Sequence, residues 1–254
     1  MPNDPLRIAV FGASGRMGAQ VLAASAGRVE VGLALVRPDS PDLGRACPGG
    51  SPARGGVIRF EGASTAAWDG IGAVVDFSSP DGLREAITYC GRYRIALVSG
   101  TTPCAPELDR SLDDLALRVP VLHAPNFSRG LWALAKMIPG FRSWLGASFE
   151  AGLLDIHHAA KKDAPSGTAR ALAAAWGSGQ SERTASASLR LGQAVGDHAL
   201  WIEGTGERIE IWHRVRDRRV FAEGALDAAL ALAARPPGRY TLDSLWEPSG
   251  GSCL

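Results

Sequence analysis

Short apolar runs alternate with amphipathic stretches in the first half of the 254-residue chain. Runs such as Leu6–Phe11 and Ala73–Phe77 are apolar throughout, as is typical of strands buried on both faces of a parallel sheet. Pro80–Tyr93 has the period of a helix, with proline in its first turn. The pattern predicts strands at 6–11, 29–36, 73–77, 95–98 and 119–124, helices at about 18–25, at 80–93 and from 106, and a loop at 38–56. This alternation favours an α/β fold, a Rossmann-like parallel sheet covered by helices.

The pattern changes after Asn126. Here it predicts helices at 127–145, 166–176 and 221–234, and strands at 149–158, 185–191, 198–203 and 207–214. Consecutive strands without intervening helices indicate an antiparallel or mixed sheet, and hence a smaller α+β domain. We therefore expect a first domain at 1–126, to which 222–254 returns, and a second domain at 127–221.

Composition excludes several classes of protein. The 27 basic and 26 acidic residues give a net charge of +1, so no nucleic-acid partner is expected. No apolar run reaches the ~20 residues needed to cross a bilayer, and the first residues lack a secretory pattern. The four cysteines are scattered, without a Cys-x-x-Cys pair, which argues against a disulfide framework and favours the reducing cytoplasm.

A glycine-rich turn joins the first predicted strand to the first helix. Its glycines are Gly12, Gly15 and Gly18, and Arg16 and Met17 lie between the last two. Such glycines let the backbone approach a pyrophosphate, while the helix N-terminus supplies N–H groups and partial positive charge. The spacing is a variant of the dinucleotide-binding motif. The alternative is a plain strand-to-helix turn.

The end of the second strand predicts which nucleotide is bound. NAD-specific domains place a carboxylate there for the ribose 2′-hydroxyl, whereas this chain has Val36-Arg37. Arg37 is suited to a 2′-phosphate, with help from Arg16. We therefore expect NADPH to bind at least as well as NADH. The alternative is that Arg37 is only a solvated loop residue.

Three more strand ends lie at the edge of the sheet where open α/β proteins bind ligands. One carries Gly100, Thr101 and Thr102, and another carries Ala124 and Phe127. We expect the first group to hold a nicotinamide carboxamide and Phe127 to wall the ring. The third strand end, Asp76-Phe77-Ser78-Ser79, borders the same edge. Ser and Thr are also ordinary turn residues, so each signal is weak by itself.

The stretch from Asp155 to Ala169 is the most informative about function. His157 and His158 are adjacent, and neighbouring residues of a strand point to opposite faces, so the two imidazoles have different tasks. Imidazole exchanges protons near neutral pH. Lys161 follows, and Ser166-Gly167-Thr168 begins a helix whose N–H groups suit an anion. Proton donor, ammonium group and helix start together indicate a carboxylate-bearing substrate.

Two other interpretations of this stretch stay open. A histidine pair at a strand end is often structural. Imidazole also binds zinc, yet no third ligand is convincingly spaced, so we expect no metal.

These segments resemble a known family. Gly-Ala-Ser-Gly-Arg-Met-Gly, Asp-Phe-Ser, Gly-Thr-Thr, Ala-Pro-Asn-Phe-Ser and His-His-x-x-Lys-x-Asp-Ala-Pro-Ser-Gly-Thr-Ala occur in that order. The chain is similar in this to 4-hydroxy-tetrahydrodipicolinate reductase, also called dihydrodipicolinate reductase, over nearly its whole length. The resemblance implies NAD(P)H-dependent reduction of a cyclic dicarboxylate in lysine and diaminopimelate synthesis. It also implies a homotetramer built through the sheets of the second domain.

The resemblance also implies roles for particular residues. His157 would be the general acid, and Lys161 a catalytic or carboxylate-binding cation. Substrate would be held by His158, Gly167 and Thr168. The cofactor site would be lined by Gly12, Arg16, Met17, Gly100, Thr102, Ala124 and Phe127. The segments themselves add Gly15, Gly18, Arg37 and Thr101, as argued above.

The chain departs from the family pattern in four places. Pro103 replaces the usual glycine after Gly-Thr-Thr, Val36 the acidic ribose residue, and Asp155 the usual Glu before the histidines. The stretch 176–187 is shorter than usual. These changes leave two other functions open: a related reductase of another imine or keto acid, and a non-catalytic nucleotide sensor.

Overall fold

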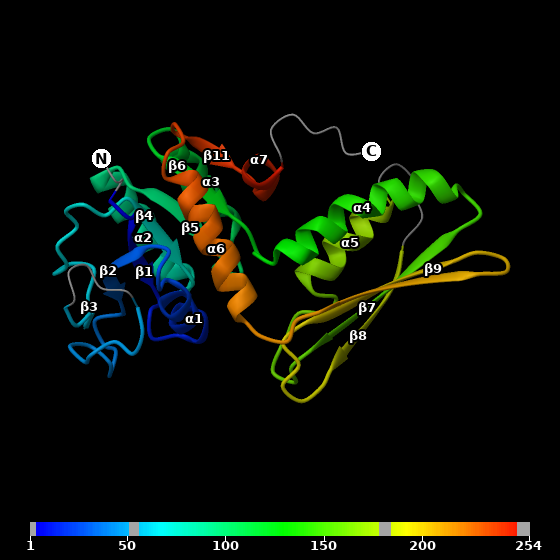
Figure 1. The fold of residues 1–254 in the computed structure, drawn as a ribbon, viewed down its shortest axis with the longest axis horizontal. Helices are drawn as coiled ribbons and strands as arrows, with labels where there is room; N and C mark the ends of the chain where they lie inside the picture. Colours follow the sequence, from blue (N-terminus) through cyan, green and yellow to red (C-terminus); the bar gives the residue numbers. More distant parts are fainter. Residues whose placement is uncertain (1–3, 51–55, 178–183, 248–254) are drawn as a thin grey trace. The chain divides into compact units, whose positions relative to one another are not determined.

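The computed structural model describes residues 4–50, 56–177 and 184–247. The chain divides into two compact units (Figure 1). The first runs to Phe127 and resumes at Phe221, and the second comprises Ser128–Val220. The polypeptide therefore leaves the first unit once and returns to it through its last helices.

A parallel sheet forms the centre of the first unit. Its described strands are β1 (Arg7–Phe11), β2 (Glu30–Leu35), β3 (Phe60–Glu61), β4 (Ala73–Asp76), β5 (Ala96–Ser99), β6 (Pro120–His123) and β11 (Gly238–Tyr240). They lie in the order β11-β6-β5-β4-β1-β2-β3, and all neighbouring pairs are parallel. Without β11 this is the 3-2-1-4-5-6 order of a Rossmann domain, with its switch point between β1 and β4. The predicted α/β fold is confirmed.

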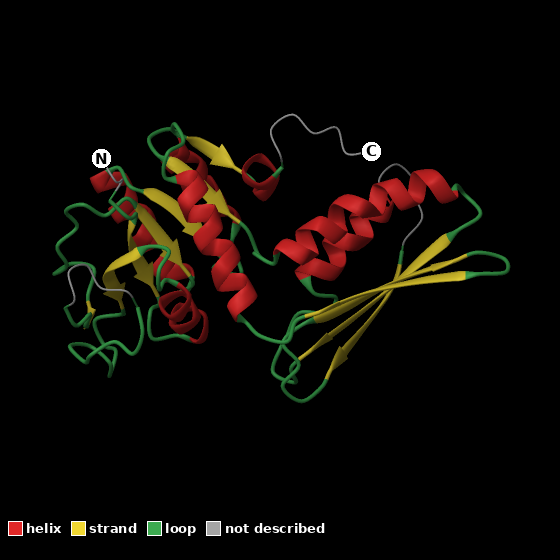
Figure 2. Ribbon diagram, viewed as in Figure 1, coloured by secondary structure: helices red, strands yellow, loops and turns green. Residues whose placement is uncertain are grey.

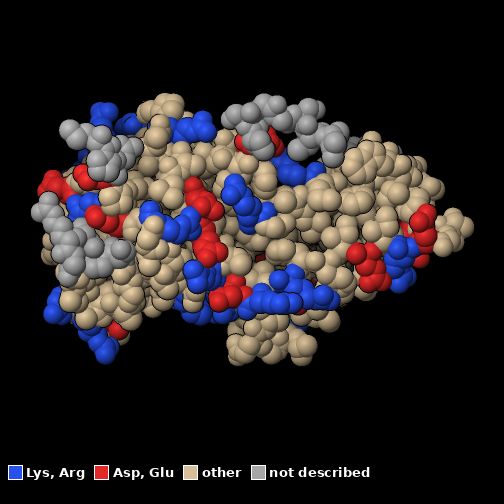
Figure 3. Space-filling view, in the orientation of Figure 1, with Lys and Arg blue, Asp and Glu red and all other residues tan. Residues whose placement is uncertain are grey.

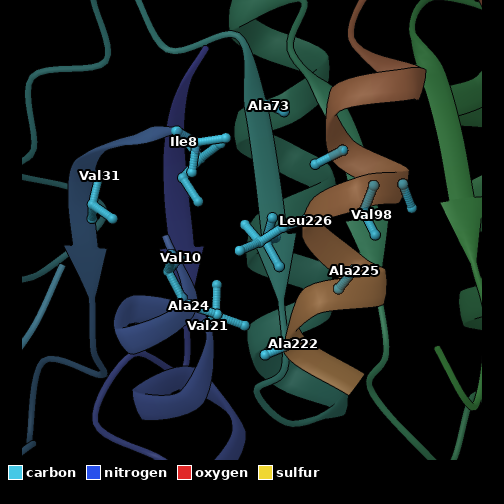
Figure 4. Packing of buried hydrophobic residues seen from close by; sticks show 14 of the residues in the cluster. Ile8, Val10, Val21, Ala24, Val31, Ala73, Val98, Ala222, Ala225 and Leu226 are labelled. Atoms are coloured by element: carbon cyan, nitrogen blue, oxygen red, sulfur yellow. The ribbon is translucent and has the colours of Figure 1, made fainter. Parts of the chain in front are cut away.

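Helices cover both faces of this sheet (Figure 2). They are α1 (Arg16–Ala24), α2 (Pro80–Tyr93), α3 (Pro106–Ala116) and α6 (Arg219–Leu232), and α7 (Leu242–Trp246) follows β11. The apolar side chains of α1 and α6 share one core with the sheet, and those of α2 and α3 share the other. Figure 4 shows Leu226 of α6 directed at the strands, in the same apolar cluster as Ile8 and Val98.

The sequence explains where α2 begins and ends. The Ser79 hydroxyl accepts a hydrogen bond from the N–H of Gly82, and Pro80 occupies the first helical position. Arg94 ends the helix in the left-handed region, at φ 56°. The helix buries Leu83, Ala86 and Cys90, one face of the 3.6-residue period.

The second unit is a mixed sheet covered by two helices. Its described strands are β7 (Glu150–His157), β8 (Ala185–Arg190), β9 (Asp197–Glu203) and β10 (Arg208–Arg214), in the order β10-β9-β7-β8. β8 runs parallel to β7, and the other pairs are antiparallel. Helices α4 (Arg129–Leu145) and α5 (Gly167–Gly177) lie against each other and share an apolar core with one face of the sheet. The predicted α+β character of this part is confirmed.

Alternation along β7 decides which side chains face the helices. Leu153 belongs to the core beneath α4 and α5, and successive strand residues point to opposite faces. Asp155 and His157 therefore lie on the helix-covered face, while Leu154 and Ile156 lie on the other. The polar pair sits at the end of the strand where the apolar core stops.

Some elements differ from the prediction. The helix expected at 127–145 begins at Arg129, because the Ser128 hydroxyl accepts the N–H of Leu131 and caps it. The strand expected to reach residue 158 ends at His157. The short elements β3, β11 and α7 were not predicted. The shortened stretch 176–187 and the loop 38–56 include residues 178–183 and 51–55, which lie outside the described residues.

Candidate active site

The glycine-rich turn has the tight backbone that its sequence predicts. Gly12 has φ of 71°, and a Cβ there would lie 2.7 Å from the carbonyl oxygen of Phe77. A Cβ on Gly18 would lie 2.1 Å from the carbonyl oxygen of Gly12. The turn itself is closed by the N–H of Gly15, which donates to the same oxygen at 2.9 Å. Gly12 and Gly18 are therefore required for the turn to lie against the start of α1.

The start of α1 is suited to a phosphate. Gly15 is the N-cap and has no side chain to accept a hydrogen bond from the first turn, so the N–H groups of that turn can bind a ligand. Gly15 and Arg16 are exposed, and Met17 is half-buried. N–H groups and partial positive charge at an exposed helix start suit a pyrophosphate, so these residues fit a dinucleotide.

Arg37 follows β2 and extends into solvent. Its side chain is 75% exposed, and its Nε lies 3.7 Å from the carboxylate of Asp39. An exposed pair at this distance contributes little free energy. Arg37 is therefore accessible to a 2′-phosphate, although Asp39, which the sequence argument did not weigh, is a local competitor.

A buried carboxylate that the sequence argument left unassigned organises the ends of β4 and β5. Asp76 is fully buried and accepts hydrogen bonds from the hydroxyls of Ser99 at 2.6 Å and Thr101 at 2.7 Å, and from Ser78. Burial raises the pKa of Asp76, while these hydrogen bonds lower it; burial is the larger effect. Thr101 is 2% exposed, and its hydroxyl is directed at Asp76. It thus shapes the turn beside the predicted cofactor edge.

Phe127 and Gly100 also have packing roles in the first unit. The Phe127 side chain is 1% exposed and meets Phe77 edge to face, with ring centroids 5.8 Å apart. A Cβ on Gly100 would lie 2.2 Å from the Phe77 ring. Phe77 is the half-buried member of the pair. It is therefore better placed than Phe127 to present a ring to a ligand.

The remaining predicted cofactor residues lie at the same strand ends. Thr102 is exposed and precedes Pro103 through a cis peptide bond. Ala124 is 6% exposed, and its N–H donates to the carbonyl of Ser99 at 3.0 Å. That bond joins the turn after β6 to the end of β5, so these two loops form one edge.

In the second unit, His157 ends β7 and is 8% exposed. Burial lowers its pKa, Lys161 lowers it further, and Asp155 opposes both. The Nδ1 atom of His157 lies 3.6 Å from the Asp155 carboxylate, beyond ordinary hydrogen-bond length. A Cβ on Gly196 would lie 3.2 Å from Nε2, so glycine there leaves room beside the ring. This environment favours the neutral imidazole over the protonated one.

Two further histidines, for which the sequence predicts no role, form a row of three rings with His157. The His198 ring lies 5.3 Å from that of His157, and the His213 ring 6.2 Å from that of His198. Their Nε2 atoms approach two serines that begin helices: Ser166 at 3.4 Å from His198, and Ser128 at 3.1 Å from His213. Burial lowers the pKa of His198 to about 4, so it is neutral at physiological pH. Only strand register brings these rings together, because His213 and His198 pair across β10 and β9.

Lys161 and His158 lie at the turn after β7. The ammonium group of Lys161 is 2.7 Å from the carboxylate of Asp163, and its side chain is 25% exposed. Its N–H donates to the carbonyl of His158 at 3.0 Å, so the turn brings the two residues together. His158 is half-buried. Asp163 occupies the place near Lys161 that a ligand carboxylate would take.

Helix α5 presents its N-terminus in the same unit. The Ser166 hydroxyl accepts the N–H of Ala169 at 3.1 Å, as an N-cap does. Gly167 and Thr168 form the first turn and are half-buried. Among the predicted site residues, the structure thus brings His157, Lys161 and the start of α5 into one unit.

The described part of the chain contains neither a metal-ligand cluster nor a membrane-spanning helix. Within 4–50, 56–177 and 184–247, no group of three or more His, Cys, Asp or Glu side chains is arranged to hold a metal ion. No helix in the described part of the chain combines the length and apolar character needed to cross a membrane. Basic and acidic side chains lie next to one another on the face in Figure 3.

Two family profiles match the chain. Residues 6–127 match "Dihydrodipicolinate reductase, N-terminus", and residues 130–245 match "Dihydrodipicolinate reductase, C-terminus". Among curated proteins, 4-hydroxy-tetrahydrodipicolinate reductase of Stenotrophomonas maltophilia (strain K279a) is 37% identical over 248 residues, which are 96% of this chain and 99% of that protein. The enzyme of the same name from Rubrobacter xylanophilus is 34% identical with the same coverage.

Solved structures show the same fold. Dipicolinate-bound dihydrodipicolinate reductase from Paenisporosarcina sp. TG-14 has a TM-score of 0.73 at 20% identity, covering 93% of this chain and 97% of that one. An amine dehydrogenase from Mycobacterium smegmatis has a TM-score of 0.61 at 14% identity, covering 96% and 97%. At these identities the likeness extends to the fold alone.

Proposed function

Because the chain belongs to the dihydrodipicolinate reductase family, we propose that it reduces 4-hydroxy-tetrahydrodipicolinate to tetrahydrodipicolinate with NADPH or NADH, the 4-hydroxyl group leaving as water. This reaction belongs to lysine and diaminopimelate synthesis. The observation that carries the proposal is the grouping of His157, Lys161 and the start of α5 in the second unit. An acid, a cation and an anion-binding helix end are the groups that a cyclic dicarboxylate requires.

The first unit would hold the nucleotide. Gly12, Gly15 and Gly18 admit the pyrophosphate, and α1 offers it the N–H groups of Arg16 and Met17. Arg37 would accept a 2′-phosphate. Gly100, Thr101, Thr102, Ala124 and Phe127 would shape the nicotinamide end, Thr101 and Phe127 as buried supports. The bound nucleotide supplies the hydride.

The second unit would hold and protonate the substrate. Lys161, His158, Gly167 and Thr168 would bind the carboxylates, with Asp163 displaced from the Lys161 ammonium group. Negative charge beside His157, and neutralisation of Lys161, would both raise the pKa of this imidazole. The histidine would then carry its proton when substrate is bound and donate it to the electron-rich ring atom after reduction. Most of the rate enhancement would come from orientation and fixed charge.

The test is the oxidation of NADPH and NADH, followed by absorbance, with dihydrodipicolinate generated in the cuvette by its synthase. We expect rapid oxidation that requires the synthase, and a kcat/KM with NADPH at least equal to that with NADH, because Arg37 replaces the usual acidic residue. Other cyclic imines and keto acids serve as controls. Oxidation with one of these but not with dihydrodipicolinate would indicate the related reductase, and nucleotide binding without turnover would indicate a sensor.

The outer face of the second sheet supports a further part of the proposal, a homotetramer. This face carries Trp201, 38% exposed, and Leu189, 48% exposed, while α4 and α5 pack on the opposite face. Burying such a face between copies would be favourable. Light scattering should give four times the mass of one chain, and Trp201→Glu should lower it. A wild-type mass of one chain at micromolar concentration would contradict the assembly.

Cytoplasmic localisation is part of the same proposal. Cys47, Cys90 and Cys104 are unpaired among the described residues, which suits a reducing compartment. The nucleotide and the small-molecule substrate are the expected partners.

A further inference from the structure

Asp155 and Arg190 form a buried ion pair next to His157. Asp155 is 0% exposed, and its carboxylate accepts a hydrogen bond from the Arg190 guanidinium at 2.7 Å. The side chain of Arg190 is 17% exposed. Register places the two where they meet, because Asp155 pairs with Ser188 and His157 with Arg190 across β7 and β8. Removing two charges from water costs free energy, so stability alone is a weak explanation for an ion pair at this place.

The pair connects the segments that carry the proposed site. The Asp155 carboxylate also accepts the N–H of Ser166 at 2.8 Å, at the N-cap of α5. The Arg190 guanidinium also donates to the carbonyl of Asp163, in the turn that presents Lys161. The strand bearing His157, the turn bearing Lys161 and the start of α5 are therefore tied to one carboxylate and one guanidinium.

Asp155 is held as a carboxylate. Burial raises its pKa, but hydrogen bonds from Arg190, the Ser166 N–H and the Ser188 hydroxyl outweigh burial and lower the pKa to about 2. Asp155 is thus charged at neutral and at mildly acidic pH. A carboxylate that stays charged 3.6 Å from an imidazole favours the protonated ring, and the guanidinium beside it opposes that effect.

The other groups facing His157 come from each neighbouring element. Lys161, from the turn after β7, disfavours the protonated ring, and Asp163 offsets part of its charge. His198, on β9, is neutral above its own low pKa, and His213 on β10 lies beyond it. Among the main causes, Asp155 thus raises the pKa of His157 against burial and Lys161, and the Arg190 charge opposes Asp155.

We propose that Asp155 and Arg190 are positioning residues, which together set when His157 carries a proton and hold it in register with the Lys161 turn and the start of α5. The inference deepens the proposed function, since it concerns the same acid. The two charges act on His157 in opposite directions, so removing each one separately should change the imidazole with an effect of opposite sign.

The experiment follows the His157 imidazole by NMR against pH in histidine-labelled protein, with His157→Gln identifying its signal. We expect Asp155→Asn to lower the titration midpoint by about one pH unit, and Arg190→Gln to raise it by about one unit. The alkaline limb of kcat/KM, where the acid loses its proton, should move the same way. Ser188→Ala removes a hydrogen bond to Asp155 without changing charge and should leave the midpoint in place.

Conservative variants keep the test decisive if Asp155→Asn fails to fold. Asp155→Glu and Arg190→Lys retain the charges and should keep midpoints near that of the wild type. Folded variants whose midpoints move in the same direction, or stay in place, would overturn the proposal. Because the titration needs no substrate, opposite shifts in a protein without reductase activity would count against the proposed function alone.

Discussion

Replacing His157 by glutamine should lower kcat by roughly 10²–10⁴-fold, the usual contribution of a positioned general acid. Glutamine keeps a polar side chain of similar reach, so the loss would come from the missing proton rather than from a cavity. The affinity for NADPH should not change, because the glycine-rich turn and α1 belong to the other unit. Initial rates in the synthase-coupled assay and a fluorescence titration with NADPH measure the two quantities.

His158→Gln is the matched control for His157→Gln. The two positions are adjacent, but His158 follows the end of β7 and is half-buried, whereas His157 is held at the end of the helix-covered face. A substrate-binding imidazole lost at 158 should raise KM more than it lowers kcat. A folded His157→Gln variant with unchanged kcat would remove that residue from its assigned role.

The fold could be predicted where the pattern was long and local. Pro80–Tyr93 is marked by an N-cap serine, a first-turn proline and three buried residues on one face, and both its bounds are confirmed. The prediction missed β3 and β11 because they have two and three residues and exist only through pairing with β2 and β6. No local period can indicate an edge strand of that length.

The candidate site, too, could be predicted only where its residues lie close together in the sequence. His157, Lys161, Gly167 and Thr168 stand within twelve residues, so one motif was enough to group them. His198 and His213 come from strands far along the chain, and only the register of β9 with β7 and β10 reveals them as neighbours. For Asp76 the sequence predicts only a place at the border of the cofactor edge. Its hydrogen bonds come from hydroxyls of the next strand and turn, and no local pattern indicates them.

The glycine-rich turn allows fold and ligand binding to be separated by two alanine substitutions. Gly18→Ala should destabilise the first unit by about 1–3 kcal/mol, because its Cβ would lie 2.1 Å from a backbone oxygen and α1 would have to move. Thermal unfolding should show a midpoint lower by about 2–12 °C. Weaker nucleotide binding would follow from the displaced helix.

Gly15→Ala is the control that keeps the turn. Gly15 has φ −75° and ψ 168°, which alanine adopts without strain. Its Cβ would lie 3.1 Å from the Gly12 oxygen, far less tight than the 2.1 Å contact at Gly18, although the backbone must still give by a few tenths of an ångström. The added methyl group would occupy the approach of the pyrophosphate to α1, so the Kd for NADPH should rise at least about tenfold (~1.4 kcal/mol) with little change in the unfolding midpoint. Unchanged affinity in this variant would mean that the phosphates bind elsewhere, whatever Gly18→Ala does to stability.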